Sequence, residues 1–167
     1  MEVTDILNCV ASIVGLLVSV IAIIISVNTS KKQTQMDLFN KRYEFYIACD
    51  IICGCCISGQ LNVMTNRLDL YVPHFSDYTF GSAKFLFDNE TATLIETIYQ
   101  KGIIYRDICC LISKFESEET YDIDLYNQNI KMKNEYCSFF EKSRKELSER
   151  MEKYLNLSSR SKFSNNR

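Results

Sequence analysis

The N-terminal part of the chain holds one long run of apolar residues. From Ile6 to Ser30 there are 25 consecutive uncharged residues, and most are Val, Ile, Leu or Ala. As an α-helix this run measures about 37 Å, more than the roughly 30 Å of hydrocarbon in a bilayer. An acidic leader precedes it and Lys31 and Lys32 follow it, whereas a signal peptide has a basic start and a small-residue cleavage site. We predict a short external leader at 1–5 and a transmembrane helix at 6–30.

Small and polar residues recur within this run at steps of 4, 3, 4, 3 and 4, a heptad spacing on one helix face. We call this set the seam, and its members are Asn8, Ser12, Gly15, Ser19, Ala22 and Ser26. Small residues let membrane helices approach closely, and their polar groups bond across the contact. The seam predicts either a tight contact between copies or, in three to six copies, the lining of a narrow aqueous pore. A single unpaired anchor is the third alternative.

The helical pattern continues beyond the paired lysines. The stretch from Gln33 to about Asn66 contains no proline, so we expect the membrane helix to run on as a stalk that is covered on more than one side. One apolar face of this stalk includes Met36 and Tyr43, and another includes Phe45 and Ile52. We expect the charged Arg42 between them to lie at a solvated edge.

Pro73 is expected to end the stalk, and the aromatic connection up to Gly81 is expected to fold back on the bundle. A second helix is predicted from the acidic start at 88–90 to Phe115, and a third from the acidic stretch at 116–121 to about Leu157. The inward positions of these helices are Ile95, Ile98, Gly102, Tyr105, Cys109 and Ile112, followed by Tyr136, Phe140, Leu147, Met151 and Tyr154. The predicted fold is all-α, with one transmembrane helix that continues into a bundle of about three helices at 31–157, and a flexible basic tail at 158–167.

Composition and charge agree with this picture. The chain has 5 Gly and 1 Pro, where average usage at 167 residues gives roughly 12 and 8, and this shortage favours long helices. Every Lys and Arg lies at or after Lys31, while the first 30 residues carry only Glu2 and Asp5. By the positive-inside rule the N-terminus is expected outside and the C-terminal domain in the cytoplasm. We expect this membrane to be the bacterial inner membrane.

Residues with reactive side chains are few or poorly placed for chemistry. Cys49, Cys53 and Cys56 share one helix face, and a reduced cytosolic thiol packs as a small apolar side chain; a zinc site is the less favoured alternative. His74 is isolated, and phosphate-loop, nucleophile-elbow and zinc-protease motifs are missing from the sequence. We therefore expect no catalytic residue, metal or cofactor.

The C-terminal segment is basic. From residue 142 onward eight Lys or Arg stand against three acids, a local balance of 8 minus 3, or +5. A solvated helix end is one interpretation, and contact with a polyanion or lipid headgroups is the other. The residues concerned are Lys142, Arg144, Lys145, Arg150 and Lys153.

Three short motifs carry a resemblance. They are DLFNKRYEFY at 37–46, KFLFD at 84–88 and YLNL at 154–157. With the membrane helix, they resemble small bacterial single-pass membrane proteins that have an LFxKRxxxY-type stalk, among them the channel effectors of Hailong-like anti-phage systems. The resemblance implies an oligomer that disturbs the membrane once the nucleotide product of a partner enzyme ceases to restrain it. It assigns no ligand-contact residue in this chain.

Two functions follow from the sequence. The first is an oligomeric membrane effector that forms or gates an ion-conducting pore and depolarises the membrane, under a cytosolic regulatory protein or a nucleotide or oligonucleotide ligand. The alternative is a non-conducting anchor or scaffold subunit that recruits a cytosolic partner.

Overall fold

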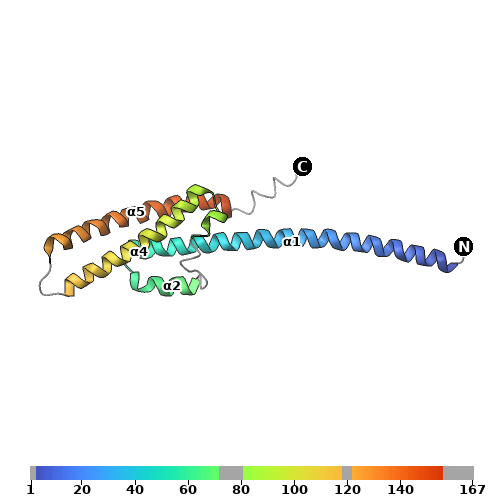
Figure 1. The fold of residues 1–167 in the computed structure, drawn as a ribbon, viewed down its shortest axis with the longest axis horizontal. Coiled ribbons are helices and arrows are strands. Elements are labelled where there is room, and N and C mark those ends of the chain that lie inside the picture. The colour runs from blue at the N-terminus through green and yellow to red at the C-terminus, as the bar shows by residue number, and fades with distance from the viewer. Residues whose placement is uncertain (1–2, 72–80, 118–121, 156–167) are drawn as a thin grey trace. The chain divides into compact units, whose positions relative to one another are not determined.

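All regular elements in the part of the chain that the structure describes are helical. This structure is a computed structural model, and it describes residues 3–71, 81–117 and 122–155. Figure 1 shows the elements, which are α1 (Val3–Ser58), η1 (Leu61–Val63), α2 (Met64–Tyr71), η2 (Ala83–Phe85), α4 (Asn89–Ser117) and α5 (Ile123–Leu155). The predicted all-α fold is confirmed. Pro73, His74 and the predicted tail at 158–167 lie outside the described residues.

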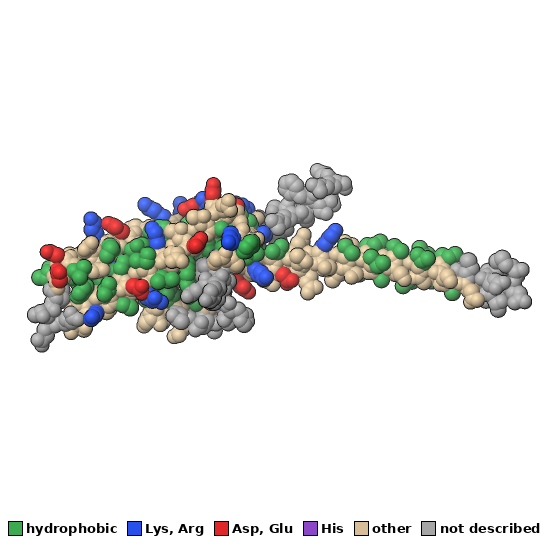
Figure 2. Space-filling model, viewed as in Figure 1, with side chains coloured by type: hydrophobic (Ala, Val, Ile, Leu, Met, Phe, Trp, Pro, Cys, Tyr) green, Lys and Arg blue, Asp and Glu red, His purple; other side chains and the backbone are tan. Residues whose placement is uncertain are grey.

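The chain divides into two compact units, residues 1–38 and 39–167, and the division falls within α1. In the first unit the described side chains from Ala11 to Asp37 are exposed, including those of the large aliphatic residues between Ile13 and Val27. Figure 2 shows these aliphatic side chains in green along the N-terminal part of α1. Among the described residues, α1 is the one helix that is long and apolar enough to cross a membrane by length and composition.

Gly59 ends α1. Its φ is +70°, the left-handed conformation that glycine adopts without steric cost, and the N–H of Gln60 donates a hydrogen bond to the carbonyl oxygen of Cys55 over 3.0 Å. This bond from the second residue after the cap back to the last turn is the Schellman arrangement. The predicted unbroken helix to about Asn66 was therefore wrong, because a glycine turn after Ser58 ends it well before Pro73. Residues beyond the turn form η1 and the separate helix α2.

The core of the second unit lies where the C-terminal part of α1 packs with α4 and α5. Figure 1 shows α4 and α5 side by side. The inward positions predicted on these helices are confirmed as buried for Ile95, Ile98, Gly102, Tyr105, Ile112, Phe140, Leu147 and Met151, whereas Cys109, Tyr136 and Tyr154 are half-buried. Gly102 permits the close packing of α4 on α1, because a Cβ at this position would lie only 2.8 Å from Cγ2 of Ile52.

α1 buries the predicted apolar face of Phe45 and Ile52 in this core, whereas the other predicted face is exposed at Met36 and Tyr43. Phe45 and Ile52 are 2% and 3% exposed, while Met36 and Tyr43 on the other face keep 53% and 47% of their surface. The prediction that partner helices cover both faces was wrong for these two residues. Tyr43 instead stacks on Phe39, with 6.2 Å between the ring centroids.

Candidate functional site

The seam lies on α1 in the first unit, and all six of its side chains are exposed. The hydroxyl of Ser12 donates to the carbonyl oxygen of Asn8, and that of Ser19 donates to the carbonyl oxygen of Gly15, each over 2.8 Å. These bonds to the preceding turn satisfy both donors within the helix itself. Nothing lies within 4 Å of a Cβ built on Gly15, so this position leaves open space on the helix surface.

In the second unit a group of aromatic and charged side chains joins α1, the η2–α4 turn and the end of α5. We call this group the junction cluster, and its members are Arg42, Phe45, Leu86, Phe87, Asp88, Lys153 and Tyr154. The Nε of Arg42 donates to the carbonyl oxygen of Leu86 over 3.0 Å, and its guanidinium lies 5.0 Å from the ring centroid of Tyr154. Phe87 makes edge-to-face contacts with Phe45 at 5.7 Å and with Tyr154 at 5.1 Å between centroids. Such aromatic pairs stabilise a contact beyond the area that they bury.

Asp88 accepts several polar contacts in the junction cluster. One carboxylate oxygen accepts the backbone N–H of Thr91 over 2.8 Å and so caps the start of α4, as the sequence predicted. The other accepts from the ammonium of Lys153 and, over 2.9 Å, from the hydroxyl of Tyr154. The bond from Lys153, with those from Thr91 and Tyr154, holds the pKa of this carboxyl well below its usual range. Asp88 is thus ionised at neutral pH and links the N-terminus of α4 to the end of α5.

The three motifs of the resemblance meet in this cluster. Arg42 belongs to the first motif, Phe87 to the second and Tyr154 to the third. The expectation that Arg42 lies at a solvated edge was wrong, because Arg42 is half-buried against the other two motifs. The available signal was the pairing of aromatic with charged residues in the first two motifs, and the Lys153 that directly precedes Tyr154 of the third.

Three of the five basic residues proposed for polyanion or lipid contact are engaged within the protein. Arg144 pairs with Asp50 over 2.6 Å, Arg150 pairs with Glu90 over 2.8 Å, and Lys153 pairs with Asp88. Lys142 and Lys145 are exposed. The described part of the basic segment therefore connects α5 to α1 and to the start of α4 through three ion pairs, which leave out Lys142 and Lys145.

The cysteines of α1 form part of the core, as predicted. Cys49, Cys53, Cys55 and Cys56 are fully buried, and the Sγ of Cys137 from α5 lies 3.7 Å from the carbonyl oxygen of Cys56. Burial raises the pKa of the Cys53 thiol to about 12, so this thiol stays protonated. Cys110 on α4 is exposed.

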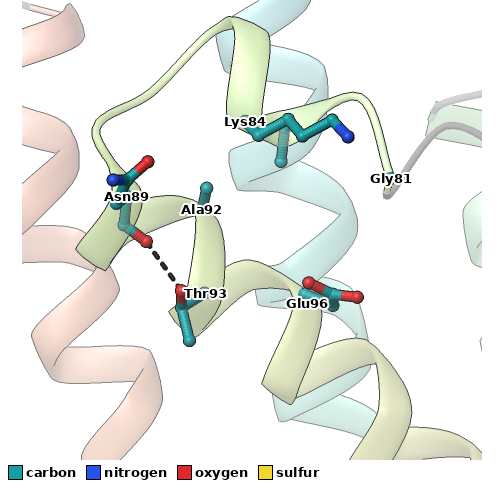
Figure 3. Close-up of a pocket in the computed structure, with 7 residues that line it drawn as sticks. Gly81, Lys84, Asn89, Ala92, Thr93 and Glu96 are labelled. Carbon is teal, nitrogen blue, oxygen red and sulfur yellow. Dashed lines mark hydrogen bonds between the residues drawn. The ribbon is translucent and has the colours of Figure 1, made fainter.

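A small hollow lies at the corner between η2 and α4 (Figure 3). Lys84 comes from η2, and Asn89, Thr93 and Glu96 come from α4; the hydroxyl of Thr93 donates to the carbonyl oxygen of Asn89 over 2.7 Å. Its volume of about 260 Å³ is below the range usual for ligand pockets. The ammonium of Lys84 makes a cation–π contact with Phe85, 5.2 Å from the ring centroid.

Comparison of the chain with protein-family models, with curated proteins and with solved structures found no match.

Proposed function

We propose that this protein is an oligomeric single-pass membrane effector whose α1 helices associate along the seam and form or gate an ion-conducting pore. The observation that carries the proposal is the seam itself, six small or polar side chains in heptad register on an otherwise aliphatic exposed helix. Aliphatic residues are stable against lipid, whereas polar side chains in a membrane favour a helix contact or a water-filled path. The open space at Gly15 supports close approach of a second helix.

The proposed orientation places the N-terminus outside and residues 39–167 in the cytoplasm of a bacterium, at the inner membrane. The charge asymmetry around Lys31 and Lys32 supports it. A tag before Met1 should then be digested by protease added to spheroplasts, and a tag after Arg167 should be protected. Protection of the N-terminal tag together with digestion of the C-terminal tag would invert the orientation.

The cytosolic unit is proposed to control the assembly. The junction cluster supports this role, because Arg42 on α1 is bound directly to the η2–α4 turn and to α5. A regulatory protein or nucleotide that altered the packing of α4 and α5 would thereby act on α1. The proposed biological setting is anti-phage defence by membrane depolarisation, and this rests on the resemblance alone.

A non-conducting anchor or scaffold is the second candidate. The hydroxyls of Ser12 and Ser19 are satisfied by carbonyl oxygens of their own helix, so they need neither water nor a partner helix. A dry contact between copies is therefore compatible with the same seam. In this function the cytosolic unit recruits a partner to the membrane and no current flows.

The first experiment tests association. Gly15→Ile and Ser19→Ile keep the helix apolar but fill the seam, whereas Ile21→Leu keeps both volume and hydrophobicity outside it. Crosslinking in membranes should show fewer oligomers for the two seam variants and wild-type yield for the control. Equal yields in all three would remove the basis for both the pore and the tight contact.

The second experiment separates the pore from the anchor. One cysteine is introduced in place of Ser12, Ser19 or Ser26 in the seam, or of Leu17, Val20 or Ile24 outside it. The background chain already carries Cys9→Ala and Cys110→Ser, because Cys110 is exposed. A small aqueous thiol reagent should block liposome ion flux through the seam variants and leave the others unchanged. A hydrophobic constriction can keep the resting pore closed, so flux is also measured in the chain carrying Arg42→Gln, in which the junction cluster is weakened. Absence of flux in both backgrounds, with oligomers confirmed in the same liposomes, would contradict the pore and favour the non-conducting anchor.

A further inference from the structure

The second unit contains a larger cavity away from the junction cluster. Its volume is about 660 Å³, within the range of small-molecule sites, and its walls come from three places in the fold. Leu61 and Asn62 of η1 form one wall, α4 forms the second with residues between Arg106 and Glu116, and Lys133 of α5 closes the third. The turn at Gly59 directs η1 to this position.

Two cations and one carboxylate line the cavity. Arg106 and Lys133 line it against the single carboxylate of Glu116, a balance of 2 minus 1, or +1. The hydroxyl of Tyr126 donates to Glu116 over 3.2 Å, and Arg106 bonds to Asp107 over 3.1 Å. Among the described residues no carboxylate pairs with Lys133, which is half-buried. A half-buried ammonium without a counter-ion favours an anionic ligand group beside it.

The rest of the lining is largely apolar. Leu61 is half-buried and Ile112 is 5% exposed, and Cys109 and Cys110 also line the cavity. Burial raises the pKa of the Cys109 thiol and the ammonium of Lys133 opposes that rise, in keeping with a charge close to the sulfur. Asn62 and Ser113 add amide and hydroxyl donors.

We propose that this cavity, between η1, α4 and α5, binds a small organic monoanion with its acidic group at Lys133 and Arg106 and its apolar body against Leu61 and Ile112. The ligand is a rigid or short-chain carboxylate or sulfonate. The site is independent of the seam, and its occupancy does not depend on whether the oligomer conducts ions.

Calorimetric titration of the full chain in lipid nanodiscs tests the site, with empty nanodiscs as the blank. The probes are naphthalene-2-sulfonate, its neutral isostere naphthalene-2-sulfonamide, and inorganic sulfate. The sulfonate should bind about tenfold more tightly than the sulfonamide, the discrimination that one charge-assisted hydrogen bond provides. Lys133→Gln should abolish this difference, and Lys133→Arg should retain it.

Lys131→Gln is the matched control, because Lys131 is an exposed lysine two positions away on α5 that does not line the cavity. It should bind both probes as the wild type does. Glu116→Gln removes the one negative charge in the lining and should strengthen binding of the sulfonate. The proposal is overturned by equal affinity for sulfonate and sulfonamide in the wild type, by sulfate binding as tightly as the sulfonate, by an equal loss in Lys131→Gln, or by no binding of either aromatic probe.

Discussion

Arg42 donates a hydrogen bond from its Nε to the carbonyl oxygen of Leu86 over 3.0 Å, across 44 positions of the sequence. The same guanidinium lies over the ring of Tyr154. One side chain of α1 thus contacts both the turn before α4 and the end of α5. This bond connects α1, which carries the seam, to the turn that leads into α4.

Arg42→Gln should destabilise the second unit by about 1–2 kcal/mol, since it removes the cation over Tyr154 and weakens the bond to Leu86. Lys41→Gln removes an exposed charge from the neighbouring position and should stay within about 0.5 kcal/mol of wild type. Combining Arg42→Gln with Tyr154→Leu should cost less than the sum of the two single changes, because both remove the same contact. Thermal unfolding followed by circular dichroism measures these changes. Equal effects of the Arg42 and Lys41 variants would contradict a structural role for the junction cluster.

Asp88→Asn should make stability less dependent on acid pH. Folding lowers the pKa of Asp88, so its carboxylate contributes stability above the unfolded pKa of about 3.9, and this contribution is lost as pH falls below that value. The gap between wild type and Asp88→Asn should therefore be constant near neutrality and close below about pH 4. Unfolding midpoints across this range measure the gap.

Asp88→Ala separates the capping role from the charge. Asparagine still caps a helix, whereas alanine does not, so Asp88→Ala should cost about 1 kcal/mol more than Asp88→Asn. This additional loss should be the same at acid and at neutral pH, because neither alanine nor asparagine titrates. Glu149→Gln, which neutralises an exposed carboxylate on α5, serves as the control. A stability difference between wild type and Asp88→Asn that widened toward low pH would contradict the lowered pKa of Asp88.

Gly102→Ala should destabilise the packing of α4 on α1 by about 1–3 kcal/mol, because the new methyl would meet Cγ2 of Ile52. Gly54→Ala is the matched control within α1, since nothing lies within 4 Å of its Cβ position. It should instead stabilise the helix by about 0.5–1 kcal/mol. Ile52→Leu removes the branch methyl and should recover part of the loss in Gly102→Ala. Equal effects at the two glycines would contradict the close contact.

Thiol alkylation should distinguish the surface from the core. Cys110 is exposed and should react first with a neutral maleimide, while Cys49 and Cys53 should react only after unfolding. The pKa of about 12 at Cys53 leaves about a thousandfold less thiolate than the ordinary value near 9, in addition to the steric protection. Peptide mass spectrometry over time measures the order of labelling. Early labelling of Cys49 or Cys53 in the folded chain would contradict the packing of α1.

The sequence alone determined the helices of this protein and most of their positions. An apolar run of 25 residues, the scarcity of Gly and Pro, and 3.6-residue periodicity are local properties, and so is the cap that Asp88 provides to α4. The end of α1 is also encoded locally, at Gly59, although no proline stands there. A helix start or end depends on a few neighbouring residues, and these can be read directly from the sequence.

Only the tertiary structure decided which face of α1 is buried and what Arg42 contacts. Both faces carry large apolar residues, so periodicity did not choose between Phe45 with Ile52 and Met36 with Tyr43. The choice follows from the position of α4, where Gly102 leaves room for Ile52. Likewise, no spacing along the chain indicates that Arg42 meets Leu86 and Tyr154. Contacts between distant segments depend on how complete helices pack against one another, and the physical information for that packing is distributed over all of them.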